Sequence, residues 1–178
     1  MVKNAAIFFD RDGVLIEAPL DKFKKPISIK YKDEIKILND VEKICKYYEK
    51  KYYLIMITNQ PDVSRKNNSK ENIEEINLEL KSKLKLDDIY VCYCDTDTCP
   101  NRKPNPGMIF KAQKKYNLNL KNSYFIGDRW RDVDASNEAG CSSIFLNYNY
   151  NEALNSKPNF TIKNLNEVLN IIKWKEQF

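Results

Sequence analysis

The chain has 178 residues, a length typical of one domain with a single core. Its 30 basic residues are interleaved with 25 acidic ones, so the formal charge of +5 forms no basic stripe of the kind that binds nucleic acid. No apolar run could span a bilayer and no export signal is recognisable, so we expect a cytoplasmic protein without a membrane partner. Histidine is absent, so a general acid or base must be a carboxylate, Lys, Tyr or Cys.

Short apolar runs alternate with helical patterns along the chain. The apolar runs predict strands over 5–9, 53–57, 89–92, 124–126 and 143–146. Apolar residues at helical spacing predict helices over 37–48, 73–84, 109–116, 133–139 and 165–172. This alternation predicts an α/β fold, a Rossmann-like parallel sheet with helices on both faces, in a single domain over residues 1–178. Parallel sheets bind ligands at the carboxyl ends of their strands.

Polar residues follow the predicted strands directly. Asp10 and Asp12 leave the first strand, Thr58 follows the second, and Asp128 follows the fourth. Carboxylates that converge at such an edge suit Mg²⁺, which prefers oxygen ligands. With its charge neutralised, Asp10 can attack phosphorus while Asp12 transfers protons. Thr58 and the backbone amides after it, at Asn59 and Gln60, can then hold a phosphoryl oxygen, and Lys103 can neutralise the charge that develops on it.

The segments FFDRDGVLIE, MITNQPD, NRKPNPGM and FIGDRWRDVDASNEAGC resemble the four ordered motifs of the haloacid dehalogenase (HAD) superfamily and cover most of the chain. Within it they most resemble subclass IIIA, the branch of D-glycero-D-manno-heptose 1,7-bisphosphate phosphatase and histidinol-phosphate phosphatase. The resemblance implies a HAD-like, capless fold, because neither gap between the first three motifs has room for a cap. It also implies a Mg²⁺-dependent phosphomonoester hydrolase that acts on a small phosphorylated sugar through an aspartyl-phosphate, with the heptose bisphosphate as the favoured substrate.

The resemblance also implies a role for individual residues. It assigns Asp10 as the nucleophile, Asp12 as the acid/base, and Thr58 and Lys103 as phosphate-binding catalytic residues. The magnesium ligands would be Asp10, the Asp12 carbonyl and Asp128. Arg102 and Arg129 would recognise the substrate, and Asp132 would support Lys103 or a metal-bound water. Without a cap, the choice of substrate would rest on the loops 17–32 and 92–101.

The cysteine loop departs from the branch pattern. In this branch a Cys-x-His pair and a Cys-x-Cys pair before the RKP segment commonly hold zinc. Here the loop reads CYCDTDTC, which leaves Cys92, Cys94 and Cys99 as zinc ligands, with Asp95 or Asp97 able to complete the site. Asn101 stands where the fourth cysteine would be and is a poor zinc ligand. The loop therefore holds a structural zinc or is a metal-free loop with free thiols.

Other functions remain open at this stage. Histidinol phosphate is the nearest alternative substrate, and a polynucleotide phosphatase is a second enzymatic alternative that the charge distribution disfavours. A non-enzymatic alternative is a scaffold or receiver in which Asp10 accepts phosphate as a signal. Asp12 argues against that role, because a neighbouring acid/base promotes the loss of the phosphate.

Overall fold

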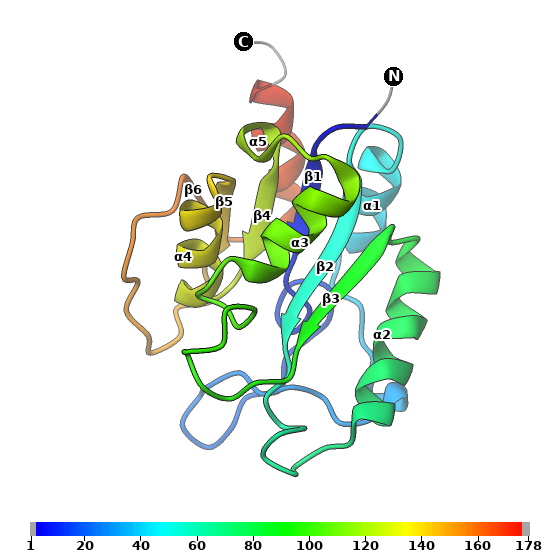
Figure 1. Ribbon diagram of the computed structural model, residues 1–178, viewed down its shortest axis with the longest axis vertical. Coiled ribbons are helices and arrows are strands. Elements are labelled where there is room, and N and C mark those ends of the chain that lie inside the picture. The colour runs from blue at the N-terminus through cyan, green and yellow to red at the C-terminus, as the bar shows by residue number, and fades with distance from the viewer. Residues whose placement is uncertain (1–2, 176–178) are drawn as a thin grey trace.

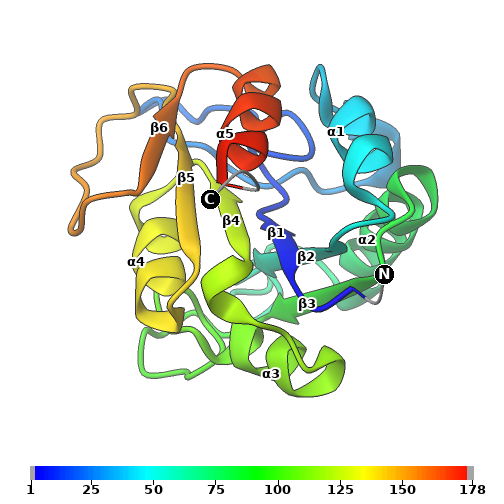
Figure 2. The same cartoon turned by 90° about the horizontal axis from the view of Figure 1, so that it is seen from above.

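The computed structural model describes residues 3–175 and shows a parallel sheet between two layers of helices (Figures 1 and 2). Within these residues the sheet has six strands in the order β3-β2-β1-β4-β5-β6, and all neighbours are parallel. The strands are β1 (Ala6–Phe9), β2 (Tyr53–Asn59), β3 (Asp88–Cys92), β4 (Tyr124–Gly127), β5 (Ser142–Leu146) and β6 (Phe160–Ile162). No cap domain is present among the described residues, so the predicted capless α/β fold is confirmed.

Helices cover both faces of the sheet. They are α1 (Val41–Tyr48), α2 (Lys70–Leu84), α3 (Gly107–Tyr116), α4 (Trp130–Ala139) and α5 (Val168–Lys175), with short 3-10 turns η1 (Lys32–Glu34), η2 (Leu120–Asn122) and η3 (Leu165–Glu167). Figure 2 shows α1, α2 and α5 on one side of the sheet and α3 and α4 on the other.

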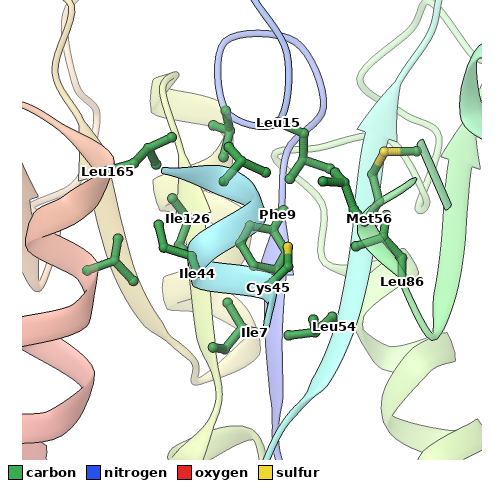
Figure 3. Packing of buried hydrophobic residues seen from close by; sticks show 14 of the residues in the cluster. Ile7, Phe9, Leu15, Ile44, Cys45, Leu54, Met56, Leu86, Ile126 and Leu165 are labelled. Atoms are coloured by element: carbon green, nitrogen blue, oxygen red, sulfur yellow. The ribbon is translucent and has the colours of Figure 1, made fainter. Parts of the chain in front are cut away.

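The central strand β1 is held by a separate apolar core on each face. Ile7 and Phe9 belong to the core under α1, α2 and α5, and Figure 3 shows Ile44 and Cys45 of α1 beside them. Phe8 belongs to the opposite core under α3 and α4. Truncating such a buried Phe to Ala costs about 3–5 kcal/mol. The end of β1, where the first motif begins, is therefore fixed from both faces.

Apart from element boundaries that shift by a few residues, two features of the structure differ from the sequence predictions. The helix predicted over 37–48 begins only at Val41, because Asp40 has a left-handed backbone (φ 68°) and Ile37 forms an antiparallel bridge with Ile16. Strand β6 was not predicted, because it is only three residues long and no apolar run marks it. Neither difference moves a motif away from the edge of the sheet.

The carboxyl ends of β1, β2 and β3 lie at one edge, and the loops that follow them gather there, at the bottom of Figure 1. Of these loops, 17–32 carries the exposed apolar side chains of Leu20, Phe23 and Ile27.

Among the described residues, no helix combines the length and the apolar character needed to cross a membrane.

Candidate active site

A cleft of about 300 Å³ opens at the carboxyl edge of the sheet. The residues that line it come from all four motifs, from the loop 17–32 and, with Arg65, from the segment after the second motif: Asp10, Asp12, Pro26, Ile27, Ser28, Thr58, Asn59, Pro61, Asp62, Arg65, Arg102, Lys103, Asp128, Arg129, Arg131 and Asp132. The structure thus brings together the predicted nucleophile, acid/base, lysine and third aspartate. Of the predicted substrate contacts, Gln60 alone does not line this cleft.

Lys103 is at the centre of the site. Its ammonium lies 2.8 Å from Asp10 Oδ1 and 2.6 Å from Asp132 Oδ1, and it donates to the Ile57 carbonyl at 3.1 Å. Asp132 also accepts a hydrogen bond from the Arg129 amide through Oδ2, which caps the start of α4. Asp132 therefore fixes Lys103 relative to helix α4, so the predicted support of Lys103 is confirmed.

Asp128 faces the first motif across a close contact. A Cβ added at Gly13 would lie 2.1 Å from Asp128 Oδ2, and Gly13 has a φ of +86°, so only glycine suits this turn. Both oxygens of Asp128 are buried and have no hydrogen-bond partner within residues 3–175. One carboxylate oxygen from each of Asp10, Asp128 and Asp132 lies within 4.8 Å of the others. Buried oxygens without partners and converging negative charge fit a divalent cation that binds oxygen ligands.

The carboxylates in this cluster are held in an environment that favours their neutral forms. Burial raises the pKa of Asp10 from 3.8 to about 6, and Asp132 adds to the rise while Lys103 limits it. Burial and the charges of Asp10 and Asp132 raise the pKa of Asp128 well above its usual value. Burial alone would lower the pKa of Lys103, but Asp10 and Asp132 more than offset this and raise it. One ammonium therefore pairs with two of the three carboxyl groups, and a bound cation would favour the ionised forms of all three.

Asp12 lies at the wall of the cleft and accepts several hydrogen bonds. Its Oδ2 accepts from Ser28 Oγ at 3.0 Å, from Gln60 Nε2 at 2.9 Å and from Arg11 Nε at 3.2 Å. Arg11 Nη2 also donates to Oδ1 at 3.3 Å. The side chains of Ser28 and Arg11 were not singled out from the sequence, because Ser28 lies in a loop without a motif and a charged residue beside Asp12 looks like a solvent-exposed one.

The three residues at the end of β2 have different surroundings. Thr58 is buried and its hydroxyl accepts a hydrogen bond from Gln60 Nε2 at 2.8 Å. Asn59 exchanges two hydrogen bonds with the backbone of Lys103, at 2.9 and 3.1 Å. Gln60 is fully buried and links Thr58 to Asp12. The side chains of Asn59 and Gln60 thus hold other site residues, and the predicted contacts of their backbone amides with a phosphoryl group stay a prediction.

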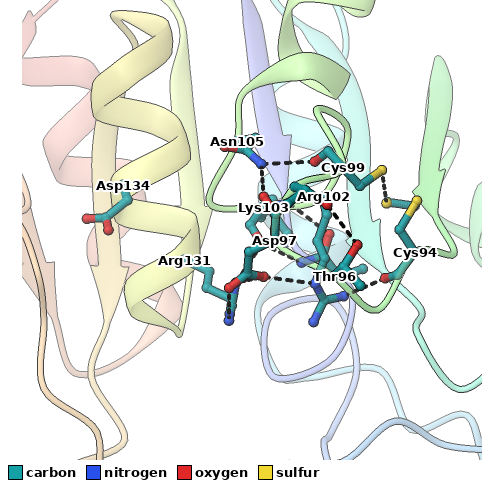
Figure 4. Close-up of polar contacts among 12 residues, drawn as sticks. Cys94, Thr96, Asp97, Cys99, Arg102, Lys103, Asn105, Arg131 and Asp134 are labelled. Carbon is teal, nitrogen blue, oxygen red and sulfur yellow. Dashed lines mark hydrogen bonds and ion pairs between the residues drawn. The ribbon is translucent and has the colours of Figure 1, made fainter. Parts of the chain in front are cut away.

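Arginine side chains surround the outer part of the cleft, and each is paired with an acidic residue. Asp97 binds Arg131 through both oxygens, at 2.7 and 3.0 Å, and also accepts from Arg102 Nε at 3.2 Å (Figure 4). Arg129 forms a two-bond ion pair with Glu152. Glu152 lies 23 residues from Arg129, in a segment without a recognisable motif, so no residue pattern predicts this pair.

The three cysteines of the loop before Lys103 also lie together. The sulfur atoms of Cys92, Cys94 and Cys99 are all within 4.8 Å of one another, and Cys92 Sγ is 3.7 Å from Cys99 Sγ. Asp97 is engaged by two arginines, whereas Asp95 has a single long ion pair with Arg65 at 3.9 Å. Asp95 is thus less engaged than Asp97, but the cluster of sulfur atoms includes neither carboxylate.

Comparisons with known proteins agree with this site. The family model described as "Polynucleotide kinase 3 phosphatase" matches residues 5–161. The D-glycero-alpha-D-manno-heptose-1,7-bisphosphate 7-phosphatase of Campylobacter jejuni is 33% identical over 98% of this chain and 99% of its own length. The "Histidine biosynthesis bifunctional protein HisB" of Buchnera aphidicola is 34% identical over 80% of this chain and 41% of its own length.

A similar fold is found among solved structures. The D,D-heptose 1.7-bisphosphate phosphatase from B. bronchiseptica, solved with magnesium and phosphate, has a TM-score of 0.81 and 22% identity, and the match covers 96% of this chain and 99% of that one. A HAD-like phosphatase structure from Mesorhizobium loti has a TM-score of 0.75 and 20% identity over 98% of this chain and 87% of that one.

Proposed function

Because this chain belongs to the polynucleotide kinase 3 phosphatase family of HAD-superfamily phosphoric monoester hydrolases, we propose that it removes phosphate from a small sugar bisphosphate through an aspartyl-phosphate on Asp10. The observation that carries this proposal is the placement of Asp10 against Lys103, with Asp12 on the same cleft. A nucleophile, a proton donor and a fixed cation are the groups that phosphoryl transfer needs.

The proposed reaction has two steps that use the same residues. A carboxylate oxygen of Asp10 forms a bond to phosphorus while the bond from phosphorus to the sugar oxygen breaks and Asp12 gives that oxygen a proton. A water molecule then attacks phosphorus, Asp12 takes its proton, and the released phosphate leaves Asp10 as a free carboxylate. Lys103 keeps a positive charge beside Asp10 throughout, because its raised pKa holds its proton.

The metal of this reaction would be Mg²⁺, held by the carboxylates of Asp10 and Asp128 and by the Asp12 carbonyl. The unpartnered oxygens of Asp128 and the cluster of three carboxyl groups support this assignment. When bound, such an ion neutralises charge on the nucleophile and on the phosphoryl oxygens.

A bisphosphate substrate is supported by the arginines beyond the catalytic centre. Arg65, Arg102, Arg129 and Arg131 all line the cleft, and arginine is well suited to bind phosphate through two hydrogen bonds. A second phosphate on the substrate could displace Asp97 or Glu152 from its arginine partner. D-glycero-D-manno-heptose 1,7-bisphosphate, the compound in the names of several relatives, is the substrate that we propose.

Histidinol phosphate is the second candidate substrate, and the relative in histidine biosynthesis is the observation that favours it. It carries one phosphate and a cationic amine. The positive charge of the amine would be repelled by the arginines that line the cleft, but the amine could form an ion pair with Asp97 or Asp62.

The proposed function is tested by phosphate release with Mg²⁺ from a panel of compounds. The panel contains both anomers of heptose 1,7-bisphosphate, histidinol phosphate, a 3′-phosphorylated oligonucleotide and 4-nitrophenyl phosphate. We expect the heptose bisphosphate to give the highest kcat/KM, and Asp10→Asn to abolish all turnover. A higher kcat/KM for histidinol phosphate or the oligonucleotide would contradict the proposed substrate, and full activity of Asp10→Asn would contradict the mechanism.

We also propose that Cys92, Cys94 and Cys99 bind a structural zinc ion. Their clustered sulfur atoms support this, since zinc in structural sites takes four ligands and readily takes thiolates. Elemental analysis of the purified protein should find one zinc per chain, and Cys94→Ser should lose it. Cys45→Ser, at a buried cysteine outside the cluster, is the matched control and should keep it. Zinc at trace level in the wild type would contradict the proposal.

A further inference from the structure

We propose that Arg11 is a positioning residue that, together with Asn77 of α2, holds the Asp12 carboxylate in the orientation needed for proton transfer. This inference rests on the proposed function, because it assigns a partner to the acid/base of that reaction. It is carried by the burial of Arg11 and by its contacts with Asp12 and Asn77.

Arg11 points away from the cleft that its two neighbours line. Asp10 and Asp12 line the cleft, whereas the Arg11 side chain has no exposed surface and does not line it. A guanidinium group is costly to bury without a charged partner. Because Arg11 cannot reach a substrate in the cleft, any effect that it has on the reaction must pass through another residue.

The contacts of Arg11 identify that residue as Asp12. Arg11 Nε donates to Asp12 Oδ2 at 3.2 Å, and Arg11 Nη2 lies between the two carboxylate oxygens, 3.1 Å from Oδ2 and 3.3 Å from Oδ1. Ser28 and Gln60 both donate to Oδ2. Of these three donors, Arg11 alone contacts both oxygens, and a planar guanidinium holds the plane of a carboxyl group better than a lysine ammonium does.

The far side of the guanidinium is fixed by helix α2. Arg11 Nη1 donates to Asn77 Oδ1 at 3.1 Å, and Asn77 is buried on the helix face that also carries Ile73, Ile76 and Leu80. A polar amide among apolar residues is unfavourable unless it is hydrogen-bonded. The contact with Arg11 satisfies the Asn77 oxygen, whereas the Asn77 Nδ2 group has no hydrogen-bond partner among the described residues, and through this contact α2 supports Arg11 from behind.

This arrangement predicts an effect that depends on the leaving group. A sugar alkoxide needs a proton as it leaves, so its departure depends on the orientation of Asp12. A 4-nitrophenolate ion leaves readily without a proton. A general acid contributes about 10²–10⁴-fold to the rate. Misorienting Asp12 should therefore slow hydrolysis of the alkyl ester far more than hydrolysis of the aryl ester.

The test compares kcat/KM, which reports formation of the aspartyl-phosphate, for 4-nitrophenyl phosphate and for the alkyl phosphate preferred in the panel. We expect Arg11→Lys to lose about 10²-fold or more on the alkyl ester and less than about tenfold on the aryl ester. Asn77→Ala should show the same bias with a smaller loss, and it tests the inference if Arg11→Lys does not fold. Adding Arg11→Lys to Asp12→Asn should cause little further loss, because both changes affect one function.

Two results would overturn this inference alone: equal losses on both esters, or losses that multiply fully in the double variant. Either would mean that Arg11 stabilises the fold without orienting Asp12. A folded wild-type protein that hydrolyses neither ester would instead overturn the proposed function, and this inference with it.

Discussion

Replacing Lys103 with methionine tests the electrostatics of the site, because the substitution keeps an unbranched side chain of nearly the same length and removes its charge. The ammonium of Lys103 is 2.8 Å from Asp10 and 2.6 Å from Asp132, and its side chain is 4% exposed. Removing one partner of such a buried ion pair costs about 3–5 kcal/mol, because the remaining charges lose their compensation. For a chain of this size, that loss lowers Tm by roughly 6–20 °C.

The loss should depend on pH in a defined direction. The pKa of Asp10 is raised to about 6, so the folded protein binds this proton more tightly than the unfolded chain does, and acidification through pH 6 stabilises the fold. Without Lys103, which lowers that pKa, the pKa of Asp10 rises further and acidification helps more. The difference in stability between Lys103→Met and wild type should therefore shrink as the pH falls from about 7 to about 5.

Urea denaturation with EDTA, at both pH values, measures the effect. Lys115→Met is the matched control, because Lys115 also lies 2.8 Å from an aspartate, Asp88, but its side chain is 58% exposed. We expect the control to lose much less stability than Lys103→Met, because water screens an exposed pair. Equal losses in the two variants, or a deficit of Lys103→Met that grows on acidification, would refute this reasoning.

Three further predictions follow from the same structure. Gly13→Ala should lower Mg²⁺-dependent turnover at least about tenfold, because the new Cβ displaces Asp128. The control Gly140→Ala has similar backbone strain but no atom within 4 Å of its new Cβ, so it should lose only about 1–2 kcal/mol of stability. Similar activity in the two variants would contradict the contact between residue 13 and Asp128. Asp128→Asn should melt at a higher temperature than wild type in EDTA, because it removes a carboxyl group whose ionised form burial and the charges of Asp10 and Asp132 disfavour. It should also lose the thermal shift that Mg²⁺ produces, and a preserved shift would exclude Asp128 as a ligand. In the metal-free protein, iodoacetamide should label Cys99 before Cys45. Hydrogen bonds, chiefly that with Cys94, lower the pKa of Cys99, whereas burial raises the pKa of Cys45 to about 12. Peptide mass spectrometry gives the order of labelling, and the reverse order would contradict this prediction.

Much of this fold could be predicted from the sequence, because its strands are buried on both faces and read as continuous apolar runs. The run that ends at Phe9 and the run through Ile57 both form strands, and the polar residues after them lie on the same cleft. The left-handed Asp40 and the short strand β6 were missed because neither has a residue pattern that distinguishes it from a loop.

The roles of individual polar side chains were harder to predict, because they depend on contacts between distant segments. Asn59 and Gln60 follow Thr58 in the motif, but their partners are the Lys103 backbone and Asp12. Arg11 lies between Asp10 and Asp12, which line the cleft, and is nevertheless buried against α2. Hydrophobic periodicity gives the location of an element, whereas the direction of a single polar side chain is decided by the tertiary partners that satisfy it.

The central claim, a covalent phosphoryl group on Asp10, is tested most directly by trapping it. Asp12→Asn removes the base that activates water, so this variant should accumulate the phosphorylated enzyme when mixed with 4-nitrophenyl phosphate and Mg²⁺ and quenched in acid. Peptide mass spectrometry should find one phosphoryl group on the peptide that contains Asp10, and none in Asp10→Asn. A phosphoryl group on another residue, or turnover by Asp10→Asn, would contradict the account.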